Sequence, residues 1–158
     1  MKWNEDLNAQ SDRVLVYGLI VALDLDRFEE YVEARGLDPY VPNIVTGELT
    51  NLVEEFARKH QGVIIYGLSR ERGTEEAIIE IPLGHLNIEN ILVDLQEIRQ
   101  RILELGASIS IIVIADYVSG KPARDRREAY KGTIGRKRAV KLLREVKSRG
   151  GGGIRVVV

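Results

Sequence analysis

Residues 14–28 read VLVYGLIVALDLDRF, and this stretch decides the fold class of the chain. Residues 14–23 form an almost continuous apolar run rich in Val, Leu and Ile, which is typical of a central strand buried on both faces. The run ends in two carboxylates one residue apart, Asp24 and Asp26. Either the strand reaches the surface at this point, or a divalent cation binds at its end.

Apolar periodicity along the rest of the chain alternates between helix-like and strand-like segments. It predicts strands at 63–68, 77–81, 108–115 and 154–158, and helices at 26–35, from Thr46 onward, at 88–105 and at 135–148. The polar segment between the last of these helices and the strand before it is expected to be irregular. The order predicts an α+β fold, with a ferredoxin-like βαββαβ core, helices on one face of an antiparallel sheet, and an added C-terminal helix and strand.

The composition bounds the kind of protein that this chain can be. Its 158 residues, 44% hydrophobic and 30% charged, predict a globular domain at 14–158 preceded by an N-terminal arm at 1–13. The balance of 23 basic against 24 acidic residues gives no general attraction to nucleic acid or membrane. The lack of cysteine excludes disulfides and cysteine-ligated zinc. A polar start and the absence of a long apolar run predict a cytoplasmic protein, and high Glu, Lys and Arg content is typical of thermophiles.

The predicted topology brings further carboxylates toward the end of the first strand. The third strand is expected beside the first, and the turn before it carries Glu71, Glu75 and Glu76. Mg²⁺ prefers one or two carboxylates together with waters and substrate phosphates. The arrangement therefore suits a metal-assisted phosphoryl or nucleotidyl reaction.

The four catalytic candidates are the two carboxylates at the strand end and two in the turn. We expect Asp24 and Glu75 to hold Mg²⁺ or Mn²⁺, with Asp26 or Glu76 assisting. The alternative is that Asp24 is a turn residue at the end of the strand and that Asp26 caps the next helix.

The last predicted helix carries a row of basic side chains off its apolar stripe: Arg136, Lys137, Lys141, Arg144 and Lys147. A solvated cationic face is the common explanation for such a run. The alternative is a triphosphate clamp, because the backbone amides at the start of a helix also favour phosphate. In that interpretation Arg136 and Lys137 are phosphate-binding residues.

Four short motifs, in this order along the chain, resemble those of diguanylate cyclases. DLDRF at 24–28 resembles the D-x-D-x-F that ends the family's first strand. Gly47-Glu48 resembles the Gly-Asp near the start of its second helix. GTEEAIIEIP at 73–82, preceded by Tyr66-Gly67, resembles the G-G-D-E-F hairpin. VKSRG at 146–150 resembles the Ala-Lys-x-x-Gly that ends the last helix, whose lysine contacts phosphate.

The resemblance implies a single palm-like (GGDEF-like) domain with a purine nucleoside triphosphate as ligand and Mg²⁺ or Mn²⁺ as cofactor. It makes Asp24 the first metal ligand, Phe28 a core anchor and Lys147 a phosphate contact. The hairpin departs from the pattern, because Thr74 adds a Cβ where the family keeps glycine for close approach of the nucleotide. We therefore expect the wider palm-type superfamily rather than a true diguanylate cyclase.

This wider group includes class III cyclases, palm polymerases, archaeal GTP cyclohydrolase III and the minimal CRISPR-associated polymerases. Archaeal GTP cyclohydrolase III contains two such units, and a homodimer of this chain would supply the second.

The sequence thus predicts a Mg²⁺-dependent palm-type domain that carries out nucleotidyl transfer, cyclisation or a GTP hydrolase-like reaction. The alternative is a catalytically inactive ferredoxin-like module that senses a nucleotide or bridges protein partners. A third hypothesis is nucleic-acid binding through the basic segment 121–138. It is less favoured, because the strands offer only Tyr17 and Tyr66 for base stacking.

Overall fold

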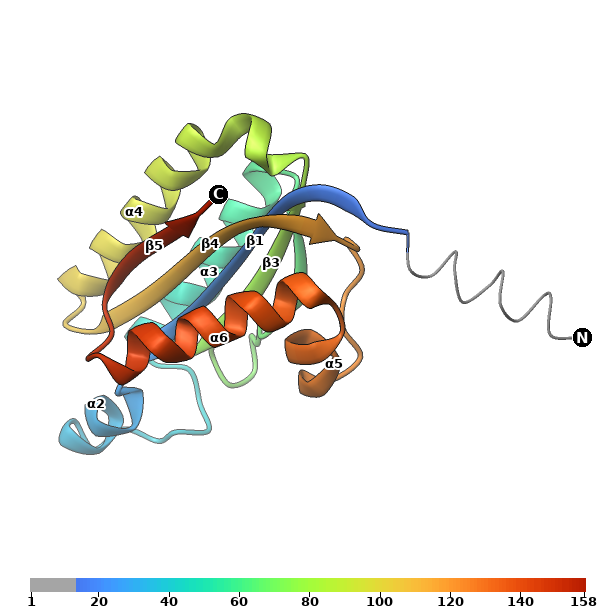
Figure 1. The fold of residues 1–158 in the computed structure, drawn as a ribbon. Coiled ribbons are helices and arrows are strands. Elements are labelled where there is room, and N and C mark those ends of the chain that lie inside the picture. Colours follow the sequence, from blue (N-terminus) through green and yellow to red (C-terminus); the bar gives the residue numbers. More distant parts are fainter. Residues whose placement is uncertain (1–13) are drawn as a thin grey trace, which may run out of the picture.

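The computed structural model describes residues 14–158, so the predicted N-terminal arm at 1–13 lies outside the described residues. One mixed sheet runs through the molecule in the order β2-β3-β1-β4-β5 (Figure 1). Its strands are β1 Val16–Asp26, β2 Val63–Tyr66, β3 Glu76–Pro82, β4 Ser108–Val118 and β5 Gly153–Val157. The central strand β1 is antiparallel to both β3 and β4, and β5 adds to β4 in parallel. The first four strands have the predicted ferredoxin-like arrangement.

Helices cover both faces of this sheet: α3 Ile44–Lys59, α4 Ile88–Glu104, α5 Arg126–Lys131 and α6 Ile134–Ser148. The short α2 Phe28–Ala34 follows the end of β1 and lies beyond that end of the sheet in Figure 1. A short 3-10 helix, η1 Gly84–Asn87, precedes α4. Helices α3 and α4 lie behind the sheet in Figure 1, whereas α6 crosses its front with α5 at one end. The prediction that the helices of the βαββαβ core pack on one face of the sheet is confirmed by α3 and α4. The added α6 covers the opposite face, because its apolar stripe needs that face for its own burial.

Two hydrophobic cores form on the two sides of β1, because successive side chains of a strand point to opposite faces. Leu19, Val21 and Leu23 pack toward α3 and α4. Ile20 and Ala22 pack in the second core, with residues of α6. The alternation continues to the end of the strand, so Asp24 and Asp26 fall on the α6 side of the sheet.

Several element boundaries differ from the predicted ones for local reasons. Helix α3 begins at Ile44, before the predicted Thr46, because Asn43 and Thr46 form a reciprocal capping box. The segment expected to be irregular contains β4 up to Val118 and the whole of α5, where the Asp125 side chain accepts a hydrogen bond from the Glu128 N–H. No helix within residues 14–158 combines the length and the apolar content that a membrane crossing requires.

A buried ion pair joins α6 to the sheet. Glu80 of β3 is fully buried, and Arg136 of α6 is 2% exposed. The Arg136 Nε donates to Glu80 Oε2 at 3.0 Å. The same guanidinium also donates to the Ser119 hydroxyl and to the carbonyls of Lys121 and Glu128. These bonds fix the start of α6 against the sheet and the segment that leads to α5.

Candidate functional site

A cleft of about 620 Å³ opens where β1 ends beside the β2–β3 hairpin. The start of α2, one residue of α5 and one of α6 complete its walls. Its charged lining is balanced, with four carboxylates and four cations: Asp24, Glu29, Glu75, Glu76, Arg27, Arg72, Arg126 and Lys147. A cleft of this composition can bind a ligand that carries both anionic groups and a cation.

Asp24 is one of the four carboxylates that line this cleft. It is the strand partner of Glu76 in the antiparallel β1–β3 register, so the two side chains share one face of the sheet. Burial raises the pKa of Asp24 to about 6, the nearby Glu76 and Asp26 add to the increase, and the Lys147 ammonium opposes it. The prediction that the end of β1 approaches the hairpin carboxylates is confirmed by this register.

Asp26 is the last residue of β1 and is 7% exposed. The hydroxyls of Ser108 and Ser110, both on β4, donate to its two carboxylate oxygens at 2.7 Å. Gly151, with a φ of +73°, approaches the carboxylate so closely that a Cβ would overlap it. The two serine hydroxyls and the Gly151 backbone therefore fix the position of the Asp26 carboxylate. It does not cap α2, whose N-cap residue is Arg27 and makes no side-chain cap bond.

Lys147 connects the two aspartates. Its Nζ lies 3.2 Å from Asp24 Oδ2 and 3.4 Å from Asp26 Oδ1, and it donates to the Leu25 carbonyl at 2.9 Å. The lysine of the motif at the end of α6 therefore lies beside the end of β1. An ammonium at this position neutralises part of the charge of the carboxylates and faces the cleft.

The two hairpin glutamates lie differently. Glu76 accepts one hydrogen bond from the Tyr130 hydroxyl, and Arg126 Nη2 lies 3.5 Å from its Oε2. Burial and the bond to Glu76 both raise the pKa of Tyr130. Glu75 is exposed and lines the cleft, while its backbone carbonyl accepts from the Leu25 N–H at 2.9 Å. Glu76, rather than the predicted Glu75, is thus the glutamate aligned with Asp24.

The turn of the hairpin is fixed to α3 by threonines. Thr74 is fully buried, its hydroxyl lies 2.7 Å from the Thr50 hydroxyl, and it accepts from the Ser69 N–H. Its side chain therefore points toward α3 and leaves the cleft open. Gly73, with a φ of +85°, passes so close to Thr46 that no Cβ fits.

Replacing Gly73 with Ala is expected to lower the free energy of unfolding by at least about 2 kcal/mol, because the new Cβ meets Thr46 and the positive φ disfavours any L side chain. Urea denaturation measures the change. Gly47→Ala is the matched control: it lies within α3 with nothing within 4 Å of the added Cβ. It is expected to leave stability unchanged or to raise it by up to about 1 kcal/mol. Equal effects of the two variants would contradict this account of the hairpin.

The basic residues predicted from the last helix separate into two groups. Arg136 is committed to Glu80 beneath α6, and Lys137 is exposed near the start of that helix. Neither lines the cleft that contains Asp24. Phosphate binding by these two residues stays a prediction. Arg126 and Tyr130 were missed as site residues; they lie within the basic segment that the sequence singled out, but its polar pattern did not indicate that α5 would dock beside the hairpin.

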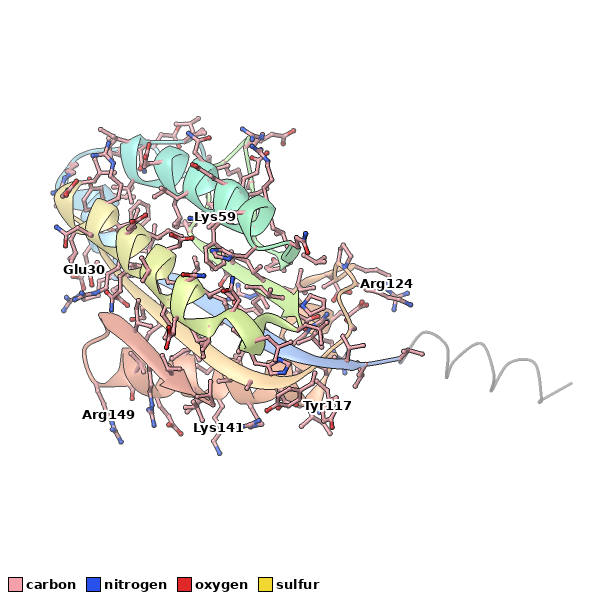
Figure 2. All side chains as sticks on the ribbon, turned by 90° about the horizontal axis from the view of Figure 1, so that it is seen from above. Glu30, Lys59, Tyr117, Arg124, Lys141 and Arg149 are labelled. Carbon is pink, nitrogen blue, oxygen red and sulfur yellow. The ribbon has the colours of Figure 1, made fainter. Side chains whose placement is uncertain are left out.

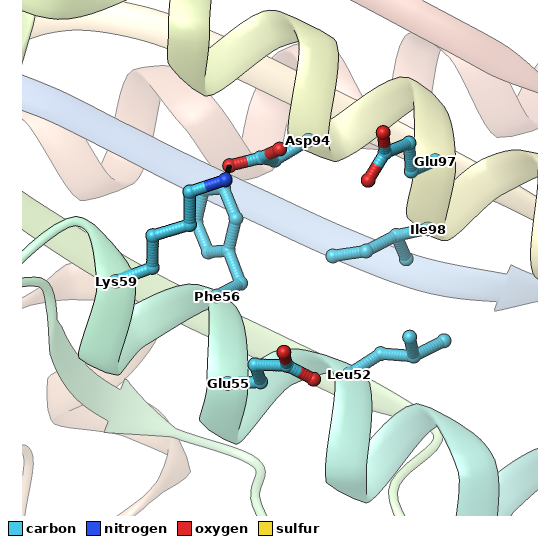
Figure 3. A pocket seen from close by; sticks show the side chains of 7 residues that line it. All are labelled: Leu52, Glu55, Phe56, Lys59, Asp94, Glu97 and Ile98. Carbon is cyan, nitrogen blue, oxygen red and sulfur yellow. Dashed lines mark ion pairs between the residues drawn. The ribbon is translucent and has the colours of Figure 1, made fainter.

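A small hollow of about 120 Å³ lies between α3 and α4 (Figure 3). Asp94 accepts hydrogen bonds there from Lys59 at 2.9 Å and from His60 at 2.6 Å. Burial raises the pKa of Asp94, but the contacts with Lys59 and His60 outweigh that effect, and the pKa is lowered. These contacts tie the two helices together, which explains the cluster without a ligand.

The carboxylates of the cleft that contains Asp24 can be compared with the ligands that a divalent cation requires. Within residues 14–158, no set of three or more His, Asp or Glu side chains is arranged to hold a metal ion. Mg²⁺ in nucleotide sites, however, is commonly held by one or two carboxylates, with phosphates and waters completing its ligands. Asp24 and Glu76 meet that smaller requirement, so the residues fit a cation that arrives with a nucleotide.

Comparison with known proteins gave similarity to solved structures only. No family model matches the chain, and no curated protein matches it either. Among solved structures, the crystal structure of the guanylyl cyclase Cya2 overlaps 90% of this chain and 75% of its own, with 15% sequence identity and a TM-score of 0.49. An overlap at this level establishes neither a family nor an activity. The α+β fold with its ferredoxin-like core follows from the strand order itself.

Proposed function

We propose that the cleft binds a purine nucleoside triphosphate together with one divalent cation, Mg²⁺ or Mn²⁺, and supports nucleotidyl transfer or cyclisation. The observation that carries the proposal is the alignment of Asp24 and Glu76 on adjacent strands, with Lys147 beside them in one cleft. Carboxylates for a cation and basic groups for phosphates are the two components that such a ligand requires. The purine rests on the motif resemblance alone.

Each residue has a distinct role in this proposal. Asp24 and Glu76 would hold the cation, which when bound neutralises charge on the phosphates. Lys147 and Arg126, which already contact these carboxylates, would bind phosphate oxygens. Asp26 is fixed by the two β4 hydroxyls and would hold Lys147 in position rather than contact the ligand.

A nucleotide-binding module without turnover is the second candidate, and one observation favours it. Glu76 already bonds Tyr130 and lies beside Arg126, while Lys147 occupies the space between Asp24 and Asp26. A cation must displace some of these contacts, so binding can be metal-assisted and still too weak for catalysis. A turnover assay on a protein that has been shown to bind separates the two candidates.

The proposal predicts that Mn²⁺ binds weakly alone and at least about tenfold more tightly when ATP or GTP is present, because the phosphates supply the missing ligands. Electron paramagnetic resonance of free Mn²⁺ measures both affinities. Glu76→Gln is expected to remove most of the nucleotide-dependent gain.

Glu75→Gln is the matched control for this measurement, because it makes the same chemical change at the neighbouring, exposed glutamate. It is expected to retain the gain. If Glu75→Gln abolishes the nucleotide-dependent increase in Mn²⁺ affinity and Glu76→Gln does not, then Glu75 is the metal ligand, as the sequence predicted. The assignment of Glu76 from the strand register is then wrong. If nucleotide has no effect on Mn²⁺ binding to the wild type, the proposed function fails.

A further inference from the structure

Positive charge is concentrated in one part of the chain. Residues 121–149 contain twelve of the 23 basic residues but only three of the 24 acidic ones, an excess of nine positive charges in a chain whose net charge is −1. This segment builds α5, α6 and their connections, so the excess lies on one side of the sheet. A charge separation of this size creates a local field that the overall balance conceals.

The three acidic residues of the segment are already engaged. Asp125 caps α5, Glu128 pairs with Arg124 at 2.8 Å, and Glu145 lies 3.8 Å from Arg155. Six exposed cations remain that form no ion pair among residues 14–158, and we call them the basic face: Arg127, Lys131, Lys137, Lys141, Arg144 and Arg149. None of them lines the cleft that contains Asp24.

These cations are arranged in rows. Lys137, Lys141 and Arg144 follow one another at i, i+4 and i+7, so they share the outer side of α6 over about 10 Å of its length. Figure 2 shows Lys141 pointing away from the sheet on this side, with Arg149 beyond it. A hollow of about 420 Å³ joins Lys137 to the two α5 cations, Arg127 and Lys131. The basic face is therefore continuous from α5 along α6.

The chemistry of the face favours a polyphosphate over a protein partner. Protein interfaces are built around buried aromatic and apolar anchors. Among the described residues, Ile134 is the only large hydrophobic side chain of α5 and α6 that is exposed. A double-stranded nucleic acid needs no such anchor, since it presents one negative charge per roughly 1.7 Å of its axis. No stacking platform is required either, because the bases of a duplex remain paired.

We propose that the basic face binds the phosphate backbone of double-stranded nucleic acid, without sequence preference. Lysine and arginine side chains along α6 contact consecutive phosphates, and the α5 cations extend the contact around the end of the helix. The face is distinct from the nucleotide cleft, because Lys147 and Arg126 turn toward the cleft while these six residues do not line it. A nucleic-acid contact and a nucleotide site would then lie on the same side of the sheet.

The test is fluorescence anisotropy of a labelled 20-base-pair DNA duplex of arbitrary sequence, titrated with the 158-residue chain at several salt concentrations. The proposal predicts binding at 50 mM salt that weakens steeply as salt rises, with each phosphate contact adding about −0.9 to the slope of log K against log salt. The triple variant Lys137→Gln, Lys141→Gln, Arg144→Gln is expected to lose at least tenfold in affinity and to flatten the slope by about 3. A duplex of different sequence should bind equally.

The control triple variant is Arg58→Gln, Arg99→Gln, Arg101→Gln, which removes the same net charge from α3 and α4. It is expected to keep the slope of the wild type. Equal losses in the two triple variants would overturn the proposal, since binding would then follow net charge alone. Lack of binding at 50 mM salt, or stronger competition by polyglutamate than by unlabelled duplex, would also overturn it.

Discussion

Replacing Arg136 with Met is expected to lower the free energy of unfolding by about 3–5 kcal/mol, because Glu80 is then left as a buried charge without its cation. Glu80 is fully buried and would keep only the Ser119 and Gly120 donors, at 2.9–3.3 Å. A loss of this size is a large part of the roughly 5–15 kcal/mol that stabilises a typical domain. Urea denaturation followed by circular dichroism measures it.

Two further variants show whether the buried charge is the cause. Arg138→Met removes the neighbouring, half-exposed arginine that pairs with Asp116, and is expected to cost no more than about 1 kcal/mol. The double variant Glu80→Gln, Arg136→Met is expected to be more stable than Arg136→Met alone, because no buried charge remains. The Glu80→Gln single variant completes the comparison. If the stability lost in the double variant equals the sum of the losses in Glu80→Gln and in Arg136→Met, the two residues act independently and the account of the pair is wrong.

Replacing Asp24 with Asn is expected to raise the free energy of unfolding at pH 7 by about 1–3 kcal/mol. The pKa of Asp24 is about 6 in the folded protein, against 3.8 for an ordinary aspartate, because burial disfavours its charged form. The upper limit of this range corresponds to the full shift in the pKa of Asp24. Because the side chain is 27% exposed, solvent screening reduces the expected increase in the free energy of unfolding. A stabilising substitution at this position would mark Asp24 as a residue kept at a cost to stability, as in functional sites.

The same shift gives a pH dependence with a definite sign. Between about pH 4 and pH 6 the folded state holds the Asp24 proton more tightly than the unfolded state does. This residue's contribution to stability therefore falls as the pH rises through that range and is constant above it. The difference in stability between Asp24→Asn and the wild type should grow from about pH 4 to pH 6 and then level off.

Glu33→Gln is the charge-matched control for this comparison, because Glu33 is exposed on α2. Its effect on stability should stay within about 0.5 kcal/mol at every pH. A constant difference between Asp24→Asn and the wild type from pH 4 to pH 7 would show that the pKa of Asp24 is not raised.

The position of Asp24 could be predicted from the sequence, whereas its partner could not. A long apolar run that ends in a carboxylate, within a βαββαβ order, places that carboxylate at the end of a central strand beside the hairpin. The choice between Glu75 and Glu76 depends on register, and a shift of one residue moves a side chain to the other face. The pairing of β2 with β3 also shifts register between Ile64 and Tyr66, which the sequence pattern did not reveal.

Two other contacts of the structure do have a signal in the sequence. Ser108 and Ser110 alternate at the start of β4, and a strand that begins with two hydroxyls on one face indicates a polar partner there. Glu80 interrupts an apolar strand, which indicates a buried cation elsewhere, and Arg136 lies on the inward side of α6. The docking of α5 beside Glu76 depends on tertiary contacts and carried no local signal.

The measurement that tests the central claim most directly is calorimetric titration of ATP and of GTP, with Mg²⁺ or with EDTA, into the wild type and Asp24→Asn. The account predicts metal-dependent binding of at least one of these nucleotides by the wild type and its loss in Asp24→Asn, a variant expected to be folded and more stable. Binding that is equal with Mg²⁺ and EDTA and unchanged in the variant, or no binding of either nucleotide to the wild type, would contradict it.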